Sequence, residues 1–115
     1  MSTAKGRKAE ERAARHLRLK GYRILDRNAR AGRGEIDIVA QKTDVLAFVE
    51  VKLRASSEAG LLAVHEDKQQ RLRSAAAAWL AGHLAQQHLQ CRFDLIILTS
   101  GGWFTRIEHL QDVFW

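Results

Sequence analysis

The sequence contains no proline and a single cysteine, Cys91, among its 115 residues. One cysteine cannot form an intramolecular disulfide, and zinc sites built from several cysteines are excluded with it. No apolar run approaches the ~18 residues of a membrane-spanning helix, and the charged segment 1–17 lacks the apolar stretch of a signal peptide. We therefore expect a cytoplasmic protein that contacts no membrane.

Motifs that define several common enzyme classes are also missing. The sequence contains no glycine-rich loop of the P-loop or dinucleotide-binding type and no nucleophile elbow of serine hydrolases. Its five histidines show no spacing typical of paired metal ligands. What is present is an ordinary balance of 46% hydrophobic and 28% charged residues, and the length supports one domain over 1–115.

Positive charge is concentrated in the first third of the chain. Residues 1–33 hold eleven Lys/Arg and three Asp/Glu, a net charge of +8, whereas residues 34–115 have a net charge of −2. A basic segment joined to a mildly acidic remainder points to a polyanion as partner, with nucleic acid favoured. A basic surface that only keeps the protein in solution is the alternative interpretation.

Hydrophobic periodicity predicts an α/β fold with an αβββαβ core, in which helices flank a mixed central sheet. The predicted helices cover 3–20 and 65–88, the predicted strands cover 22–28, 35–40, 45–53, 91–99 and 103–107, and a short helix ends the chain. The segment 29–34 is expected to be a flexible basic loop. Together with the first helix, this loop is expected to contact the backbone of a nucleic acid.

Two of these strands are expected to pair as a hairpin across the polar turn 41–44. Every odd-numbered residue of the second strand is apolar, whereas its even-numbered face ends with Glu50 and Lys52. Burial of the apolar face fixes the register, so that the numbers of paired residues sum to 85 or 87. Asp37 on the first strand then lies on the same side as Glu50 and Lys52.

The carboxylates of Asp37 and Glu50 would repel each other in this arrangement unless a cation neutralises them. A hard divalent ion such as Mg²⁺ binds through one or two carboxylates and keeps several waters, so this pair suits it. Lys52 could then orient or deprotonate an attacking water, or steady a scissile phosphate. An ordinary ion-pair network of the three side chains on an exposed hairpin is the alternative.

Four more basic side chains are candidates for phosphate contacts, each with a solvated side chain as the alternative. Lys68 lies one turn before the apolar stripe of the second long helix, and Arg54 continues the strand face that carries Lys52. Arg30 and Arg33 flank glycine in the basic loop, where both the backbone and the guanidinium can approach a phosphate.

Two acids stand in apolar surroundings. Glu10 shares the apolar stripe of the first helix with Ala13 and Leu17, where a carboxylate needs a partner unless it reaches solvent. Asp94 lies within a buried strand, and we expect it to have a structural role with a loop amide or Arg92 as its partner.

The C-terminal segment is rich in aromatic residues, namely Trp103, Phe104, Phe114 and Trp115. Some of them are expected to close the edge of the sheet. An exposed remainder would form the interface of a homodimer, which is a hypothesis at this point.

The motifs, in the order in which they occur, resemble those of the YraN-type family of small, mostly bacterial proteins. The resemblance covers about residues 6–114 and is most specific in the pairing of GEID with FVEVK. Its segments are AEERAARHLRLKGYRILDRNAR (9–30), GEIDIVA (34–40), FVEVKLR (48–54), Lys68, RFDLI (92–96) and HLQDVF (109–114). That family resembles the PD-(D/E)XK nuclease superfamily, which has the restriction-endonuclease-like fold and includes archaeal-type Holliday junction resolvases.

The resemblance implies metal-dependent cleavage of phosphodiester bonds, with Mg²⁺ or Mn²⁺ as cofactor. It implies that Asp37 and Glu50 are metal ligands, that the Val51 carbonyl completes the site, that Lys52 is catalytic and that Glu10 is a further acid. The implied substrate is nucleic acid, with DNA favoured and branched, junction-like DNA included. A non-catalytic nucleic-acid-binding module, or an interaction partner in DNA repair or recombination, is the alternative.

Overall fold

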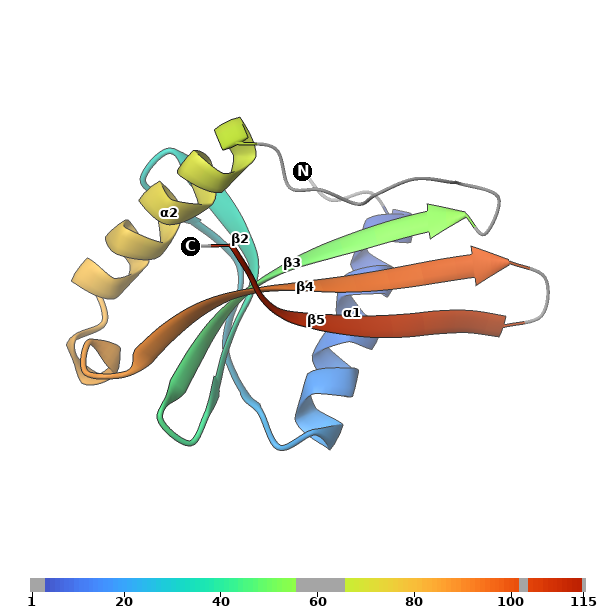
Figure 1. Ribbon diagram of the computed structural model, residues 1–115, viewed down its shortest axis with the longest axis horizontal. Helices are drawn as coiled ribbons and strands as arrows, with labels where there is room; N and C mark the ends of the chain where they lie inside the picture. Colours follow the sequence, from blue (N-terminus) through green and yellow to red (C-terminus); the bar gives the residue numbers. More distant parts are fainter. Residues whose placement is uncertain (1–3, 56–65, 102–103, 115) are drawn as a thin grey trace.

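A five-stranded mixed sheet with a helix on each face forms the centre of the protein (Figure 1). The computed structural model describes residues 4–55, 66–101 and 104–114. In chain order the elements are α1 (Ala4–Leu19), β1 (Arg23–Ala31), β2 (Gly34–Lys42), β3 (Val45–Ala55), α2 (Glu66–Ala81), a 3₁₀ turn (Leu84–Gln86), β4 (Gln90–Gly101) and β5 (Phe104–Phe114). The strands lie in the order β1-β2-β3-β4-β5, with β3 and β4 parallel and the other neighbours antiparallel, which confirms the predicted αβββαβ core. Neither described helix is long and apolar enough to cross a membrane.

The buried face of α1 consists mainly of alanines, which let the helix lie close to the sheet. Ala9, Ala13, Ala14 and Leu17 are at most 5% exposed and pack against the odd-numbered face of β3, which includes Val49. The helix is rich in strong helix formers and contains no β-branched residue, which explains why this segment is helical. The predicted packing of the apolar face of β3 against a helix is therefore confirmed.

The second helix, α2, covers the other face of the sheet. Leu72, Ala75 and Trp79 are buried there against Phe48 of β3 and Phe93 of β4. The rings of Phe48 and Trp79 meet edge to face with their centroids 6.0 Å apart. In Figure 1, α2 lies on the viewer's side of the sheet and α1 lies behind it. The even-numbered residues of β3 thus face the α2 side.

The β2–β3 hairpin has one of the two predicted registers. Ile38 pairs with Val49 and Lys42 with Val45, so the numbers of paired residues sum to 87. The pairing of β2 with β3 ends at Ile38. From this residue toward the start of β2, side chains no longer alternate regularly between the two faces of the sheet. Ile36 packs in the α2-side core although Ile38, two residues later, packs in the α1-side core. The strand β2 therefore twists away from β3 at residue 37.

The segment 29–34 forms a hairpin turn, so the prediction of a flexible loop is wrong. β1 and β2 continue through this segment and leave a two-residue turn between them. Gly32 has a φ of 55°, and a Cβ at this position would come within 2.7 Å of the Ser74 carbonyl oxygen on α2. The backbone N–H of Arg33 donates a hydrogen bond to Oγ of Ser74 at 3.1 Å. The turn is held against α2, which the composition of the segment does not reveal.

The helix predicted over 65–88 begins at Glu66 and ends at Ala81, so its predicted C-terminus is wrong; residue 65 lies outside the described residues. Glycine follows the last turn and is a poor helix former. His83 then stacks its ring on Trp79 with centroids 3.7 Å apart, and its Nδ1 lies 2.6 Å from the Trp79 carbonyl oxygen. The chain then continues through the 3₁₀ turn Leu84–Gln86 to β4.

The short helix predicted at the C-terminus is also wrong, because β5 continues to Phe114. Phe114 stacks on Phe93 with ring centroids 4.6 Å apart, and the N–H of Asp112 donates to Oδ1 of Asp94 at 3.0 Å. These contacts with β4 hold the segment extended. The homodimer hypothesis stays a prediction, because three aromatic side chains behind it lie outside the described part of the structure: Trp103, Phe104 and Trp115.

Candidate active site

An acidic side chain lies where β2 and β3 separate. Oδ2 of Asp37 accepts a hydrogen bond from the backbone N–H of Val51 at 2.8 Å. The described ladder between the strands ends at Ile38, the residue that follows Asp37 in β2, so the carboxylate takes the place of a backbone acceptor. This contact fixes Asp37 against β3 directly beside Glu50, and the structure thus brings the predicted acid pair together.

Two lysines from different elements approach the second acid. Glu50 is 7% exposed. Nζ of Lys68, in the first turn of α2, lies 3.3 Å from Oε1 of Glu50, whereas Nζ of Lys52 on β3 lies 4.0 Å from the same oxygen. The sequence predicts Lys52 beside the acid pair and Lys68 only as a phosphate contact, whereas the structure places Lys68 closer to Glu50 than Lys52. Both lysine side chains are partly exposed.

The surroundings of Asp37 disfavour its charge. Burial and the neighbouring carboxylates of Glu50 and Glu10 raise the pKa of Asp37 to about 7, although the Val51 N–H and the Lys68 ammonium act in the opposite direction. Glu10 itself is 7% exposed on α1. Acids from α1 and β3 thus both disfavour the charge of Asp37, and Lys68 offsets their effect only in part.

The donor set fits a hard divalent cation. Mg²⁺ and Mn²⁺ prefer oxygen ligands and are commonly held by one or two carboxylates, with water completing the shell. Asp37 and Glu50 supply such oxygens at a position where a further positive charge would relieve their repulsion. Among the described residues, no group of three or more His, Cys, Asp or Glu side chains is arranged to hold a metal ion. A metal site here would therefore rest on the two carboxylates and water.

The raised pKa of Asp37 predicts how stability depends on pH and on metal ions. The folded protein binds this proton more tightly than the unfolded chain, whose Asp37 has the ordinary value of 3.8, so stability falls as the pH rises toward about 7. We expect Asp37→Asn to raise the free energy of unfolding above this pH by about 1–2 kcal/mol. We also expect Mn²⁺ to raise the melting temperature of the wild type but not of this variant.

Thermal unfolding at several pH values, with and without Mn²⁺, tests this prediction. Asp44→Asn is the matched control, because Asp44 is an exposed acid in the turn of the same hairpin. If Mn²⁺ stabilised the wild type, Asp37→Asn and Asp44→Asn equally, the ion would bind at a site that does not include Asp37.

Among the described residues, no ion pair joins the other basic residues predicted to bind nucleic acid to the acid pair. Arg30 and Arg33 line an open hollow of about 520 Å³ at the β1–β2 turn. Arg54 lies farther along β3, where its Nε donates a hydrogen bond to Oγ1 of Thr99 at 3.2 Å. The structure thus separates these residues into two groups, one at the β1–β2 turn and one near the end of β3.

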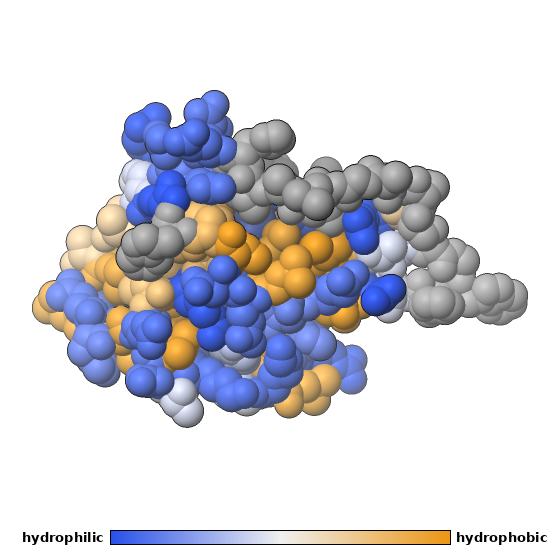
Figure 2. Space-filling model, in the orientation of Figure 1, coloured by the Kyte–Doolittle hydropathy of each residue, from blue (hydrophilic) through white to orange (hydrophobic). Residues whose placement is uncertain are grey.

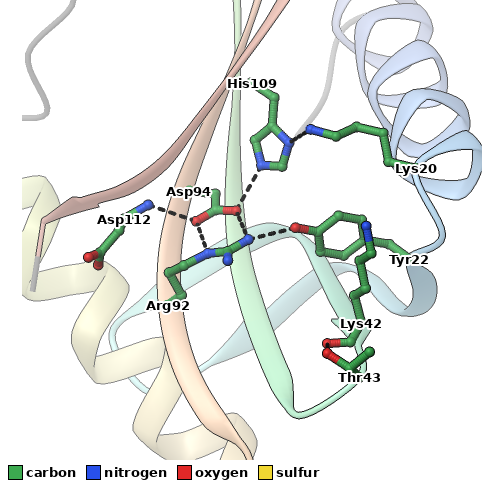
Figure 3. A network of polar contacts seen from close by, with 8 residues as sticks. All are labelled: Lys20, Tyr22, Lys42, Thr43, Arg92, Asp94, His109 and Asp112. Carbon is green, nitrogen blue, oxygen red and sulfur yellow. Dashed lines mark hydrogen bonds and ion pairs between the residues drawn. The ribbon is translucent and has the colours of Figure 1, made fainter.

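A second polar cluster, in the α1-side half of the protein, surrounds Asp94 (Figure 3). Asp94 is 1% exposed and accepts hydrogen bonds from Nε and Nη2 of Arg92, both at 2.8 Å. It also accepts the Asp112 N–H, and Nε2 of His109 lies 2.8 Å from its Oδ2. The predicted structural role of Asp94 and its pairing with Arg92 are consistent with these contacts.

Sequence reasoning missed the outer members of this cluster. Nζ of Lys20 lies 2.7 Å from Nδ1 of His109, and the hydroxyl of Tyr22 accepts a hydrogen bond from Arg92. Because an ammonium group only donates, Nδ1 of His109 accepts this bond and Nε2–H donates to Asp94. Lys20 and His109 are 89 residues apart, so no local pattern could have paired them.

Fold and site together define a class of protein. The αβββαβ order, with an acid pair where β2 leaves β3, is consistent with a restriction-endonuclease-like core. The chain belongs to the uncharacterised protein family UPF0102, whose family model matches residues 9–98. This is the YraN-type family that the motifs predicted.

Relatives in this family cover most of the chain. The UPF0102 protein of Bradyrhizobium diazoefficiens is 47% identical over 93 residues, which are 81% of this chain and 70% of the relative. The UPF0102 protein of Rhizobium meliloti is 42% identical over 110 residues, 96% of this chain and 88% of the relative. That of Maricaulis maris is 41% identical over 100 residues, 87% and 79% of the two chains.

Proposed function

We propose that this protein is a metal-dependent endonuclease that hydrolyses phosphodiester bonds of nucleic acid, with DNA as the favoured substrate and branched DNA included. The observation that carries the proposal is the placement of Asp37 at the end of the β2–β3 ladder, hydrogen-bonded to Val51 and beside Glu50. A protein that only binds nucleic acid has no use for two acids at a phosphate, because each repels it.

In this proposal Asp37 and Glu50, completed by the Val51 carbonyl, would hold Mg²⁺ or Mn²⁺, and Glu10 would add negative charge next to Asp37. When bound, the ion supplies positive charge at the phosphate that is cleaved. Lys52 lies on the same strand face as Glu50, and its partly exposed ammonium is proposed to position the attacking water and to assist its deprotonation. This assigns Lys52 the catalytic role.

Lys68 has two proposed tasks. Its ion pair at 3.3 Å orients Glu50, and its exposed end can contact a phosphate. Arg30, Arg33 and Arg54 are proposed to contact the nucleic-acid backbone on either side of Glu50. The helix α1 packs on the opposite face of the sheet. Its outer arginines therefore do not face this surface, and the expected contact of the first helix with the same stretch of backbone is dropped from the proposal.

A cleavage assay tests the proposed function directly. Linear duplex, single strand, flap and four-way junction DNA are incubated with wild type, Lys52→Ala and Lys42→Ala in the presence of Mg²⁺ or Mn²⁺. We expect cutting by the wild type and by Lys42→Ala, whose exposed lysine lies at the far end of the same hairpin. The Lys52→Ala variant should cut at least about a hundredfold more slowly, as expected for loss of a group acting in proton transfer.

Two other results would contradict the endonuclease. Equal cutting by Lys52→Ala and wild type would indicate a contaminating nuclease. Tight, salt-sensitive binding of one DNA structure without any cutting would instead support a non-catalytic binding module of repair or recombination.

A further inference from the structure

Beyond the acid pair, the α2-side face of the sheet continues with no described helix over it. In Figure 1 the second halves of β3 and β4 and the first half of β5 extend past α2, and α1 lies behind them. Figure 2 shows this face, with hydrophobic surface near the middle of the molecule and hydrophilic side chains beside it. The face offers a surface next to the proposed active site.

Two arginines and a threonine form a row across this face. Arg54 on β3 is the register partner of Thr99 on β4, and Thr99 is the register partner of Arg106 on β5. Register partners in neighbouring strands have their side chains on the same side of a sheet. Nε of Arg54 donates a hydrogen bond to Oγ1 of Thr99, and this contact orients the guanidinium group. A paired contact with a phosphate can use the terminal nitrogens.

Arg106 is held less firmly than Arg54. Its side chain is 70% exposed, and its Nε lies 3.8 Å from Oε1 of Glu108 on the same strand. A solvated ion pair of this kind contributes little to stability. The guanidinium can therefore exchange Glu108 for a phosphate, with which it can form two parallel hydrogen bonds.

The row lies at a defined distance from the acid pair. Arg54 follows Glu50 by four residues on the same strand face, which corresponds to about 13 Å along β3 at ~3.3 Å per residue. Lys52 lies midway between them. Phosphates along one strand of a duplex advance ~3.4 Å per nucleotide along the helix axis. The separation therefore corresponds to a few nucleotides.

We propose that Arg54 and Arg106, with Thr99 between them, bind a second phosphate of the nucleic-acid strand, a few nucleotides from the phosphodiester bond at the acid pair. This inference rests on the proposed function and deepens it. Because Asp37 and Glu50 repel a phosphodiester, cations placed away from them add binding free energy that the acid pair itself does not supply. A phosphate fixed at this row determines which bond of the strand reaches Glu50, and the substrate must extend past the cut on that side.

Binding measurements separate an electrostatic contact from a structural role. Fluorescein-labelled duplex and single-stranded DNA are titrated in increasing KCl with proteins that all carry Asp37→Asn to prevent cutting. Adding Arg106→Gln should weaken binding about five- to tenfold and reduce the salt slope by about one phosphate contact. Adding Glu108→Gln should tighten binding about two- to threefold, because it removes a repulsive charge and releases Arg106. Arg18→Gln, an exposed arginine on α1, should change neither quantity.

A chemical variant of the DNA locates the contact. Single methylphosphonates, which remove the charge of one phosphate, are placed at successive positions along one strand of the DNA. One non-scissile position should weaken binding to the Asp37→Asn protein but have no further effect when Arg106→Gln is added, since the two changes remove the same contact. Circular dichroism at each step confirms that the variants are folded.

The outcomes distinguish this inference from the function on which it rests. If the wild type cuts DNA but Arg106→Gln and Glu108→Gln bind like their parent, the second phosphate site is refuted and the endonuclease stands. If the two variants shift binding in opposite directions and one phosphate couples to Arg106, the site is established. If that coupling appears although the wild type never cuts, the phosphate site stands and the endonuclease is refuted.

Discussion

Replacing Asp37 with asparagine is expected to abolish metal-dependent cleavage of DNA while binding stays equal or becomes tighter. The amide keeps an oxygen that can accept the Val51 N–H, so the local backbone contact at 2.8 Å can persist. What is lost is the negative charge that would hold a divalent ion against Glu50. We expect the cleavage rate to fall by at least about a thousandfold, because the bound metal ion would stabilise the charge that develops in the transition state of cleavage.

Single-turnover cleavage and fluorescence-anisotropy binding, measured on the same DNA, test this expectation. Asp44→Asn changes an exposed acid of the same hairpin and should leave both quantities as in the wild type. Because Asp37 repels phosphate, its neutralisation should not weaken binding. An Asp37→Asn protein that cuts at the wild-type rate would remove this residue from the proposed active site.

The largest effect on stability is expected at Asp94. Replacing it with alanine leaves Arg92 and His109 without their shared acceptor in a place where Asp94 is 1% exposed. Breaking a buried, hydrogen-bonded ion pair from one side typically costs about 3–5 kcal/mol, and we expect a loss of this size. Urea denaturation at neutral pH measures it. Asp112→Asn is the control, because the contact of residue 112 with Asp94 uses its backbone N–H.

The same cluster predicts acid sensitivity. Burial opposes the charge of Asp94, but hydrogen bonds from His109, Arg92 and the Asp112 amide outweigh it and lower the pKa of Asp94. Its contribution to stability is therefore present above the ordinary pKa of 3.8 and is lost as the pH falls through the lower folded value. The Asp94→Ala protein should lack this part of the acid transition. A loss below about 1 kcal/mol at neutral pH would mean that the network does not stabilise the fold.

The parts of the structure that sequence predicted correctly are those governed by local periodicity. The alternation of β3 fixed which residues face each helix, and burial of that face left two registers, one of which occurs. The same logic placed Asp37 next to Glu50. It did not predict the twist of β2 that separates Ile36 from Ile38, because this follows from the loss of pairing with β3.

The errors arose where distant contacts override local preference. Segment 29–34 reads as a loop by composition but is held by Ser74, which comes some forty residues later. The end of β5 contains no strong strand signal, and its conformation depends on contacts with Asp94 and Phe93 of β4. The closeness of Lys68 to Glu50 also needs the path of the chain between β3 and α2, which no periodicity specifies.

The parallel pairing of β3 with β4 has a consequence for how the chain folds. All eleven residues of β3 have partners in β4, and each partner lies 45 positions later, as in Val45 and Gln90. A hairpin such as β2–β3 closes in about 1–10 μs, whereas contacts of long sequence separation form more slowly. We therefore expect Asp37 and Glu50 to meet early during folding, before α2 brings Lys68 to Glu50. The repulsion between the two carboxylates is then expected to contribute to the folding barrier, because Lys68 partly offsets it only in the folded protein.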